Sequence, residues 1–260
     1  MSGYILCQTE KAAVPYYIES ISTNIYTLEE LCYYLYHNLY LVDDTILNEG
    51  LCVWIEKELK LPSLAAKLRP HLGKFADMED VLYPVFKEIN YLTYEELRTL
   101  NSRLMRINQE HLAVRKKRKG DALVKNGMYV NAIRTYQELL ENEDSEEVRE
   151  GFLESVYHNL GCAYSYLFQM EKALECFQKA YEGGRSKKAL KTYLLAYRSI
   201  RTPLAYETRL KDLGVEEEVR REISEELERF AKKPERQADL QQMDVLLEEF
   251  MRDYHRSTGS

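Results

Sequence analysis

The stretch that decides the fold reads YHNLGCAY and occupies residues 157–164. Within it, Tyr157, Leu160 and Tyr164 recur at the spacing of one face of an α-helix. A second stripe of small and aromatic side chains follows at helical spacing, on Ala173, Phe177 and Ala180. Because Gly161 has no side chain, two helices can approach each other closely at this point. Neither helix can bury its stripe alone, so we expect the pair to pack against neighbouring helices.

The same arrangement occurs a second time upstream, over about residues 113–146. Gly120, Ala132 and Tyr136 are separated by the same intervals as the glycine, alanine and phenylalanine of the downstream copy. Gly127 fits the turn between the two helices of this copy. The chain therefore contains an internal repeat of helix pairs, which is typical of proteins that stack such pairs side by side.

These residues resemble the tetratricopeptide repeat (TPR), whose pattern W-x2-L-G-x2-Y, then A-x3-F, extends over about 34 residues. Tyr157 takes the place of the usual Trp, and Arg185 takes that of the closing Pro. The clear copies are predicted at about residues 113–146 and 154–187. A degenerate third unit, reaching about residue 213, is predicted from helices at residues 187–200 and 204–213. The resemblance implies an all-α fold, namely a short right-handed TPR-like helical solenoid.

We expect three domains in the chain. Residues 1–92 match no repeat and are predicted to form a mainly helical N-terminal domain. Residues 93–213 would hold the helix-pair repeats, and residues 214–260 would form C-terminal amphipathic helices. A solenoid otherwise ends in an exposed apolar face, so these last helices are predicted to cap it, with pairing to another chain as the alternative.

Short-range signals place several elements of the N-terminal domain. The T-x-x-E pattern of a capping box occurs at Thr27–Glu30 and at Thr93–Glu96, and each predicts the start of a helix. The second helix is expected to continue towards residue 126, as one long helix or as two in series. Asp43 or Asp44 is expected to cap the helix that contains Trp54. A small strand pair is expected between two extended stretches, residues 4–7 and 15–18.

Other features of the sequence exclude several classes of function. The five cysteines contain no C-x-x-C pair and the five histidines are scattered, which argues against a disulfide framework and a zinc site. Gly-rich phosphate loops and the common hydrolase and metalloprotease motifs are missing. The paired carboxylates are interpreted as helix caps, because the helix dipole favours negative charge there. We therefore expect no metal, no cofactor and no enzymatic activity.

A basic segment interrupts a chain whose formal net charge is −7. Residues 115–119 are all basic, and Lys125 follows. Asp121 is the one acidic residue between residues 115 and 125. The segment lies within a helical pattern and has no interleaved aromatic residues on which bases could stack. We interpret it as a solvated helix face neutralised by acidic neighbours, and we do not expect nucleic-acid binding.

With catalysis not expected, we look for a binding function on the surface of the repeats. In the TPR family, the first helix of each pair lines a concave groove that holds a peptide or helix of a partner. Mapped onto this chain, the groove residues are Lys117, Asp121, Lys125, Ser155, His158, Asn159, Cys162 and Tyr166. Some relatives clamp a terminal carboxylate with paired Lys and Asn side chains. Lys117 and Asn159 occupy two such positions, whereas Asp121 replaces an Asn and would repel a carboxylate.

The sequence thus predicts a non-enzymatic adaptor or scaffold that binds a protein or peptide partner. The alternative is a structural or regulatory homo-oligomer that assembles through its C-terminal helices or its N-terminal domain. Since no apolar run approaches the roughly 18 residues of a membrane span, a membrane location is not expected. With no secretion signal recognised, a cytoplasmic location is predicted.

Overall fold

The computed structural model describes residues 8–72, 78–141, 151–231 and 247. The chain divides into two compact units, Met1–Arg201 and Thr202–Ser260. In the described parts of both units, α-helices predominate and strands are confined to one short pair. The predicted all-α fold class is therefore confirmed. The predicted division into residues 1–92, 93–213 and 214–260 remains a prediction.

The described residues before the repeat region form a series of helices joined by brief turns. The α-helices are α1 (Leu28–His37), α2 (Glu49–Lys57), α3 (Pro62–Leu68), α4 (Met78–Glu88) and α5 (Tyr94–Gln109). Three 3₁₀ turns accompany them, η1 (Glu19–Ile21), η2 (Leu39–Leu41) and η3 (Arg69–His71). Four fully buried side chains of α1 lie in the core of this region, those of Leu28, Leu31, Cys32 and Leu35. Apolar residues on successive turns of α1 explain why this helix is central.

The strand pair differs in part from its prediction. Strand β1 (Tyr16–Ile18) lies within the expected stretch, but it pairs antiparallel with β2 (Thr23–Ile25). The predicted partner, residues 4–7, lies outside the described residues. Only four residues separate β1 from β2, so a local hairpin satisfies the backbone groups of β1.

The helix caps were predicted correctly at two of three places. Both capping boxes, at Thr27 and at Thr93, are present with their reciprocal hydrogen bonds. The prediction of Asp43 or Asp44 as the cap of α2 was wrong, because the Asn48 side chain accepts the hydrogen bond from the Leu51 amide at 3.2 Å. The residues after Asp43 form a turn, so the residue directly before the helix, Asn48, serves as the N-cap.

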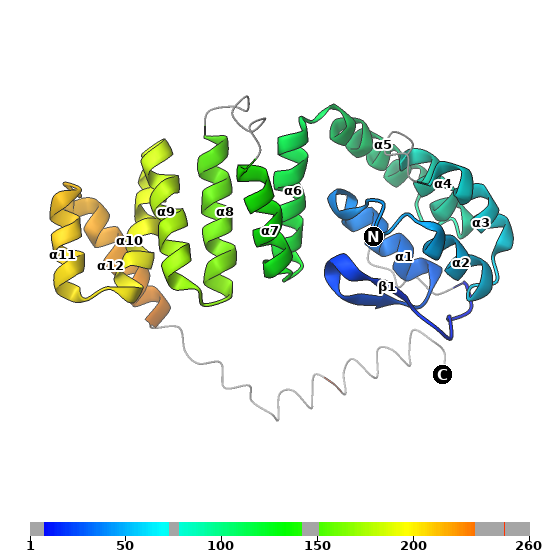
Figure 1. Cartoon of the computed structure of the whole chain (residues 1–260), viewed down its shortest axis with the longest axis horizontal. Coiled ribbons are helices and arrows are strands. Elements are labelled where there is room, and N and C mark those ends of the chain that lie inside the picture. The colour runs from blue at the N-terminus through cyan, green and yellow to red at the C-terminus, as the bar shows by residue number, and fades with distance from the viewer. Residues whose placement is uncertain (1–7, 73–77, 142–150, 232–246, 248–260) are drawn as a thin grey trace. The chain divides into compact units, whose positions relative to one another are not determined.

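The repeat region follows as a row of helices. It consists of α6 (Leu112–Lys125), α7 (Tyr129–Leu140), α8 (Phe152–Tyr166), α9 (Met170–Gly184) and α10 (Lys187–Ile200). Each helix packs against the next, and the row is visible in Figure 1. The long helical pattern after Thr93 is thus two helices in series. They separate at Glu110 and His111, where the His111 ring accepts a hydrogen bond from the Ala113 amide.

Glycines set the distance between the paired helices. A Cβ atom on Gly120 would lie 2.4 Å from Cε1 of Tyr136, and one on Gly161 would lie 2.6 Å from Cε1 of Phe177. Real Cβ atoms do not approach other atoms this closely, so each aromatic ring occupies the space that a larger residue would need. The close approach predicted from the sequence is present in both copies.

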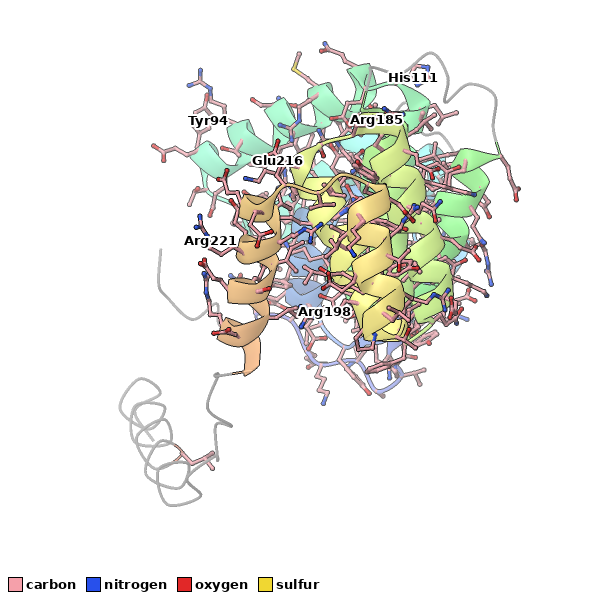
Figure 2. The ribbon with its side chains drawn as sticks, turned by 90° about the vertical axis from the view of Figure 1, so that its left-hand side faces the viewer. Tyr94, His111, Arg185, Arg198, Glu216 and Arg221 are labelled. Carbon is pink, nitrogen blue, oxygen red and sulfur yellow. The ribbon has the colours of Figure 1, made fainter. Side chains whose placement is uncertain are left out.

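The turn after α9 takes an unusual residue. Arg185, which stands where the family pattern has Pro, adopts a left-handed backbone with φ of +46°. Figure 2 shows Arg185 in the turn between α9 and α10. The following helix, α10, has the predicted bounds of residues 187–200.

The second unit contains α11 (Pro203–Asp212) and α12 (Glu217–Ala231). The helix predicted at residues 204–213 is therefore present and begins one residue earlier, after the Thr202 cap. Helix α12 is amphipathic, as predicted for this part of the chain, because Val219 and Ile223 are buried whereas Arg221 lies on its exposed side (Figure 2). Beyond Ala231 the structure describes only Leu247, which is helical and 55% exposed, so the capping role predicted for residues 214–260 stays a prediction.

Candidate protein-binding face

The first helices of the two copies, α6 and α8, contact each other and carry all eight predicted groove residues. We call the side of these helices that bears those residues the candidate face. Its members are Lys117, Asp121 and Lys125 on α6, with Ser155, His158, Asn159, Cys162 and Tyr166 on α8. Five of them form two groups of contacts, and three stand apart.

Asp121 is the centre of the largest group. Its Oδ2 atom pairs with Nζ of Lys117 at 2.8 Å. Its Oδ1 atom accepts hydrogen bonds from the Tyr136 hydroxyl at 2.6 Å and from the Asn159 amide at 2.7 Å. Burial, and then the hydrogen bond to Asp121, raises the pKa of the Tyr136 hydroxyl. Three donors from three helices therefore converge on one carboxylate.

This arrangement changes the role expected for Lys117 and Asn159. The sequence placed Lys117 and Asn159 at clamp positions and treated Asp121 as a repulsive neighbour. In the structure, the Asp121 carboxylate accepts hydrogen bonds from both side chains. A carboxylate of the chain itself thus lies between the two donors that would contact a ligand carboxylate.

His158 and Cys162 form a second group, one helical turn apart on α8. The Sγ atom of Cys162 lies 3.8 Å from Nε2 of His158, and the His158 ring packs 5.6 Å from that of Phe177. Burial, followed by the charges of Lys188 and Lys117, lowers the pKa of His158. Burial also raises the pKa of the Cys162 thiol. Both shifts favour the uncharged forms of the two side chains, and an uncharged thiol beside an uncharged imidazole does not favour nucleophilic chemistry.

Lys188 was not among the predicted groove residues. It lies on the first turn of α10, is exposed, and acts electrostatically on both His158 and Cys162. Its position extends the candidate face to α10. An alignment of α10 with α8 could have identified it. When the buried pair Tyr193 and Leu194 is aligned with the buried pair Leu160 and Gly161, Lys188 takes the position equivalent to Ser155.

The remaining candidates stand apart from the two groups. Tyr166 stacks on Tyr129 of α7, with ring centroids 4.5 Å apart and an angle of 6° between the planes. Ser155 donates a hydrogen bond to the carbonyl of Phe152 at 2.7 Å within its own helix. Lys125 is exposed, and its charge contributes, after burial and Arg103, to lowering the pKa of His37 on α1.

Part of the basic segment of α6 is neutralised by acids, in the way predicted for the whole segment. Besides the Lys117 pair, Nε of Arg118 lies 3.1 Å from Oε1 of Glu110, and Nζ of Lys119 lies 2.8 Å from Oδ2 of Asp43. The last of these pairs joins α6 to the turn before α2. The segment thus serves in part to attach the first repeat to the N-terminal helices.

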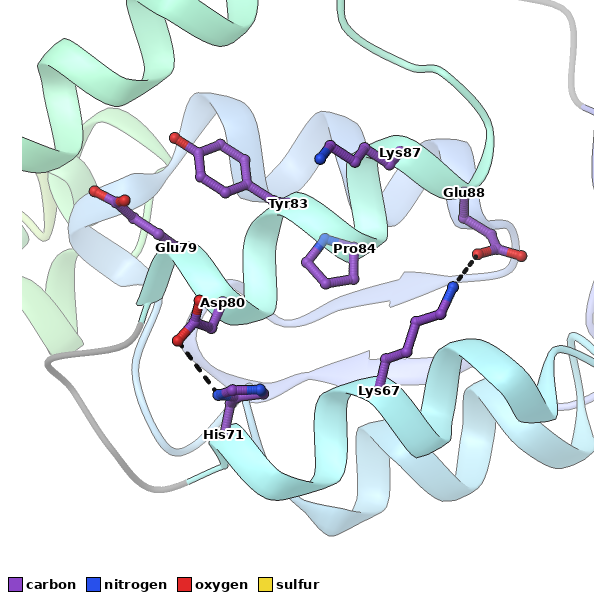
Figure 3. Close-up of a pocket in the computed structure, with 8 residues that line it drawn as sticks. All are labelled: Lys67, His71, Glu79, Asp80, Tyr83, Pro84, Lys87 and Glu88. Carbon is purple, nitrogen blue, oxygen red and sulfur yellow. Dashed lines mark ion pairs between the residues drawn. The ribbon is translucent and has the colours of Figure 1, made fainter.

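A separate hollow of about 550 Å³ lies between α3, η3 and α4 (Figure 3). Bases and acids alternate along it, with Lys67 4.0 Å from Glu88 and His71 3.4 Å from Asp80. Because two lysines and three carboxylates line it together, the hollow has no excess of positive charge that would hold an anion. Across the described residues, no group of three or more His, Cys, Asp or Glu side chains is placed to hold a metal ion. The four described cysteines carry free thiols.

Among the described residues, each helix is too short or too polar to cross a bilayer. Neither curated protein sequences nor solved structures gave a match to the chain. A family model, that of the tetratricopeptide repeat, matches residues 154–182. The match covers most of α8 and most of α9, the helix pair predicted from the YHNLGCAY stretch. The chain therefore contains a tetratricopeptide repeat, a module that generally mediates protein–protein interactions and is typically not catalytic.

Proposed function

We propose that this protein is an adaptor whose candidate face binds a peptide or helix of a partner protein. The observation that carries the proposal is the hydrogen-bonded cluster around Asp121, which joins α6, α7 and α8 into one polar surface. Such a cluster holds its side chains in place before a partner arrives. A preformed surface loses little conformational entropy on binding, so more of the contact energy appears as affinity.

The same cluster defines what the face prefers. Lys117 and Asn159 already donate to Asp121, so the terminal carboxylate of a peptide would compete with an internal carboxylate for them. We therefore propose that the partner contributes an internal segment rather than its C-terminus. Exposed groups at the borders of the face, Lys188 and Tyr166, would supply further contacts.

Affinity capture from the native cell extract tests the proposal. The full-length wild-type chain is compared with the Lys188→Glu variant, in which an exposed charge on the candidate face is reversed. The matched control is Lys179→Glu, because Lys179 is also an exposed lysine but lies on α9, the second helix of its pair. Mass spectrometry identifies captured proteins, and calorimetric titration then measures direct binding.

A partner bound by wild type and by Lys179→Glu, with at least about tenfold weaker affinity for Lys188→Glu, would support the candidate face. Equal affinity of all three proteins for the partner would contradict the assignment to this face. If wild type captures nothing but its own chain, the adaptor proposal is wrong and self-assembly becomes the better account.

A further inference from the structure

Exposed apolar side chains gather at the turns between paired helices. Phe168 is 88% exposed and Tyr166 is 58% exposed, and both lie at the junction of α8 and α9. Val130, at the start of α7, is also 58% exposed. Stacking of Tyr129 on Tyr166 brings the α6–α7 and α8–α9 turns together. We call the four side chains of Tyr129, Val130, Tyr166 and Phe168 the aromatic edge.

Phe168 occupies a backbone position that disfavours it. Its φ is +57°, in the left-handed region, where a Cβ atom is crowded. The equivalent turn of the upstream copy has Gly127, with φ of +76°. Phe168 also gains almost no burial within the chain, because it is 88% exposed. An unfavourable backbone together with an exposed ring is not explained by folding stability, and it points to a role in recognition.

The charges that flank the aromatic edge are basic. Lys125 and Lys172 lie at the helix ends next to the two turns, and both are exposed. The neighbouring acid, Glu171, is neutralised by Arg201, which donates to both carboxylate oxygens at 2.7 Å. The electrostatic complement of such a surface is an acidic segment.

We propose that the aromatic edge docks an acidic segment of a partner protein that carries an aromatic or branched aliphatic side chain. The apolar side chain contacts Phe168 and the Tyr129–Tyr166 stack, while its acidic neighbours face Lys125 and Lys172. The inference rests on the proposed function, since both require a protein partner, and it adds the chemistry of that partner. It uses the turns at one end of the helices, whereas Lys188 lies on the first turn of α10 beside His158.

Phe168→Gly is the decisive variant, because it removes the ring and also suits the left-handed backbone. The full-length protein is titrated against two fluorescent peptides, measured by anisotropy. One peptide carries Phe and Leu among Asp and Glu residues, and in the other each acid is replaced by Lys. The matched control is Met105→Ala, which truncates a side chain of α5 that is 56% exposed. Thermal melting of each variant checks the fold.

The expected result is saturable binding of the acidic peptide to wild type and to Met105→Ala. Phe168→Gly should bind it at least about tenfold more weakly, with an unchanged or higher melting temperature. The lysine peptide should also bind wild type at least about tenfold more weakly. No saturation by the acidic peptide up to about 1 mM would overturn the proposal, as would equal binding by Phe168→Gly or equal binding of the lysine peptide.

Two further outcomes separate this proposal from the adaptor function. If Phe168→Gly retains the captured partner while Lys188→Glu loses it, the aromatic edge is wrong and the candidate face stands. If sedimentation shows that wild type self-associates and Phe168→Gly does not, the edge is a contact between copies of this chain. That result would overturn docking of an acidic partner segment.

Discussion

In the upstream copy, α6 places Gly120 against the ring of Tyr136, and in the downstream copy α8 places Gly161 against the ring of Phe177. The small residue lets the backbones approach, and the ring fills the space between them. Both copies therefore keep the same distance between their paired helices. The family model matches the downstream copy, and the geometry shows the same packing upstream.

The copies differ at positions close to this contact in the sequence. The residue after the glycine is Asp121 in the upstream copy and Cys162 in the downstream copy. The left-handed turn residue is Gly127 upstream and Phe168 downstream. Packing between paired helices thus restricts a few positions strongly, while neighbouring positions remain open to different chemistry.

The largest expected effect is on the shared contact. Gly161→Val and Gly120→Val should each lower the free energy of unfolding by about 3 kcal/mol, because the new side chain overlaps an aromatic ring. Urea titration followed by far-ultraviolet circular dichroism measures the change. Loss of less than about 1 kcal/mol in either variant would show that the ring moves aside freely.

Combining each glycine variant with a smaller partner sharpens the comparison. Phe177→Leu should recover part of the stability lost in Gly161→Val, since it makes room for the new side chain. Tyr136→Leu should recover less in Gly120→Val, because it also removes the hydroxyl that donates to Asp121. Equal recovery in the two copies would contradict this distinction.

The next effect concerns the residue after the glycine. Asp121→Ala should lower the free energy of unfolding by about 2 kcal/mol, because Lys117, Tyr136 and Asn159 lose their common acceptor. Cys162→Ala at the equivalent position should change it by about 1 kcal/mol or less, since its single polar contact is weak. Urea titration of both variants checks the difference, and similar losses would argue against a central role for Asp121.

Exchanging the turn residues should have a smaller effect. Gly127→Phe should lower the free energy of unfolding by about 1 kcal/mol, because it forces a side chain into the left-handed region at φ of +76°. Phe168→Gly should change it by less than about 1 kcal/mol, since relief of the backbone offsets the added freedom of the unfolded chain. The same urea titrations test both variants. A large loss in Phe168→Gly would indicate that the ring stabilises the fold.

The smallest expected effect is a pH dependence specific to the downstream copy. The pKa of His158 is lowered in the folded state by burial and by nearby lysines, so the unfolded chain binds more protons in acid. Its contribution to stability is complete above its ordinary pKa of about 6.5 and declines as the pH falls through the lowered value. His158→Gln should therefore flatten the decline in stability between about pH 7 and pH 5.

His37 provides the control for that measurement. Its pKa is also lowered, mainly by burial, so it contributes in the same direction and remains in the variant. A residual slope is therefore expected in His158→Gln. An unchanged slope would show that His158 gains its proton equally well in the folded and unfolded chains.

Local patterns were sufficient to predict most of the helices. Thr27 and Thr93 begin helices through capping boxes, and α10 has the bounds expected for residues 187–200. Such features depend on residues three or four positions apart, which are in contact in any helix. The close approach of the paired helices was also expected, because a glycine recurs at the same place in both copies, whereas the aromatic ring that packs against each glycine was identified from the structure. The Asp43 or Asp44 cap was wrong, since the turn after Asp43 is not visible in a helix pattern.

Local sequence patterns were thus enough to predict the helix pairs, their close approach at Gly120 and Gly161, and the residues of the candidate face. The contacts that those residues make became visible only in the folded chain. Asn159 reaches Asp121 across 38 positions of sequence, and Lys188 reaches the surroundings of His158 from a third helix. Contacts of this kind depend on the rotation and height of one helix against another. The packing of whole helix faces sets the rotation and the height of each helix, and neither can be predicted from the spacing of a few residues in the sequence.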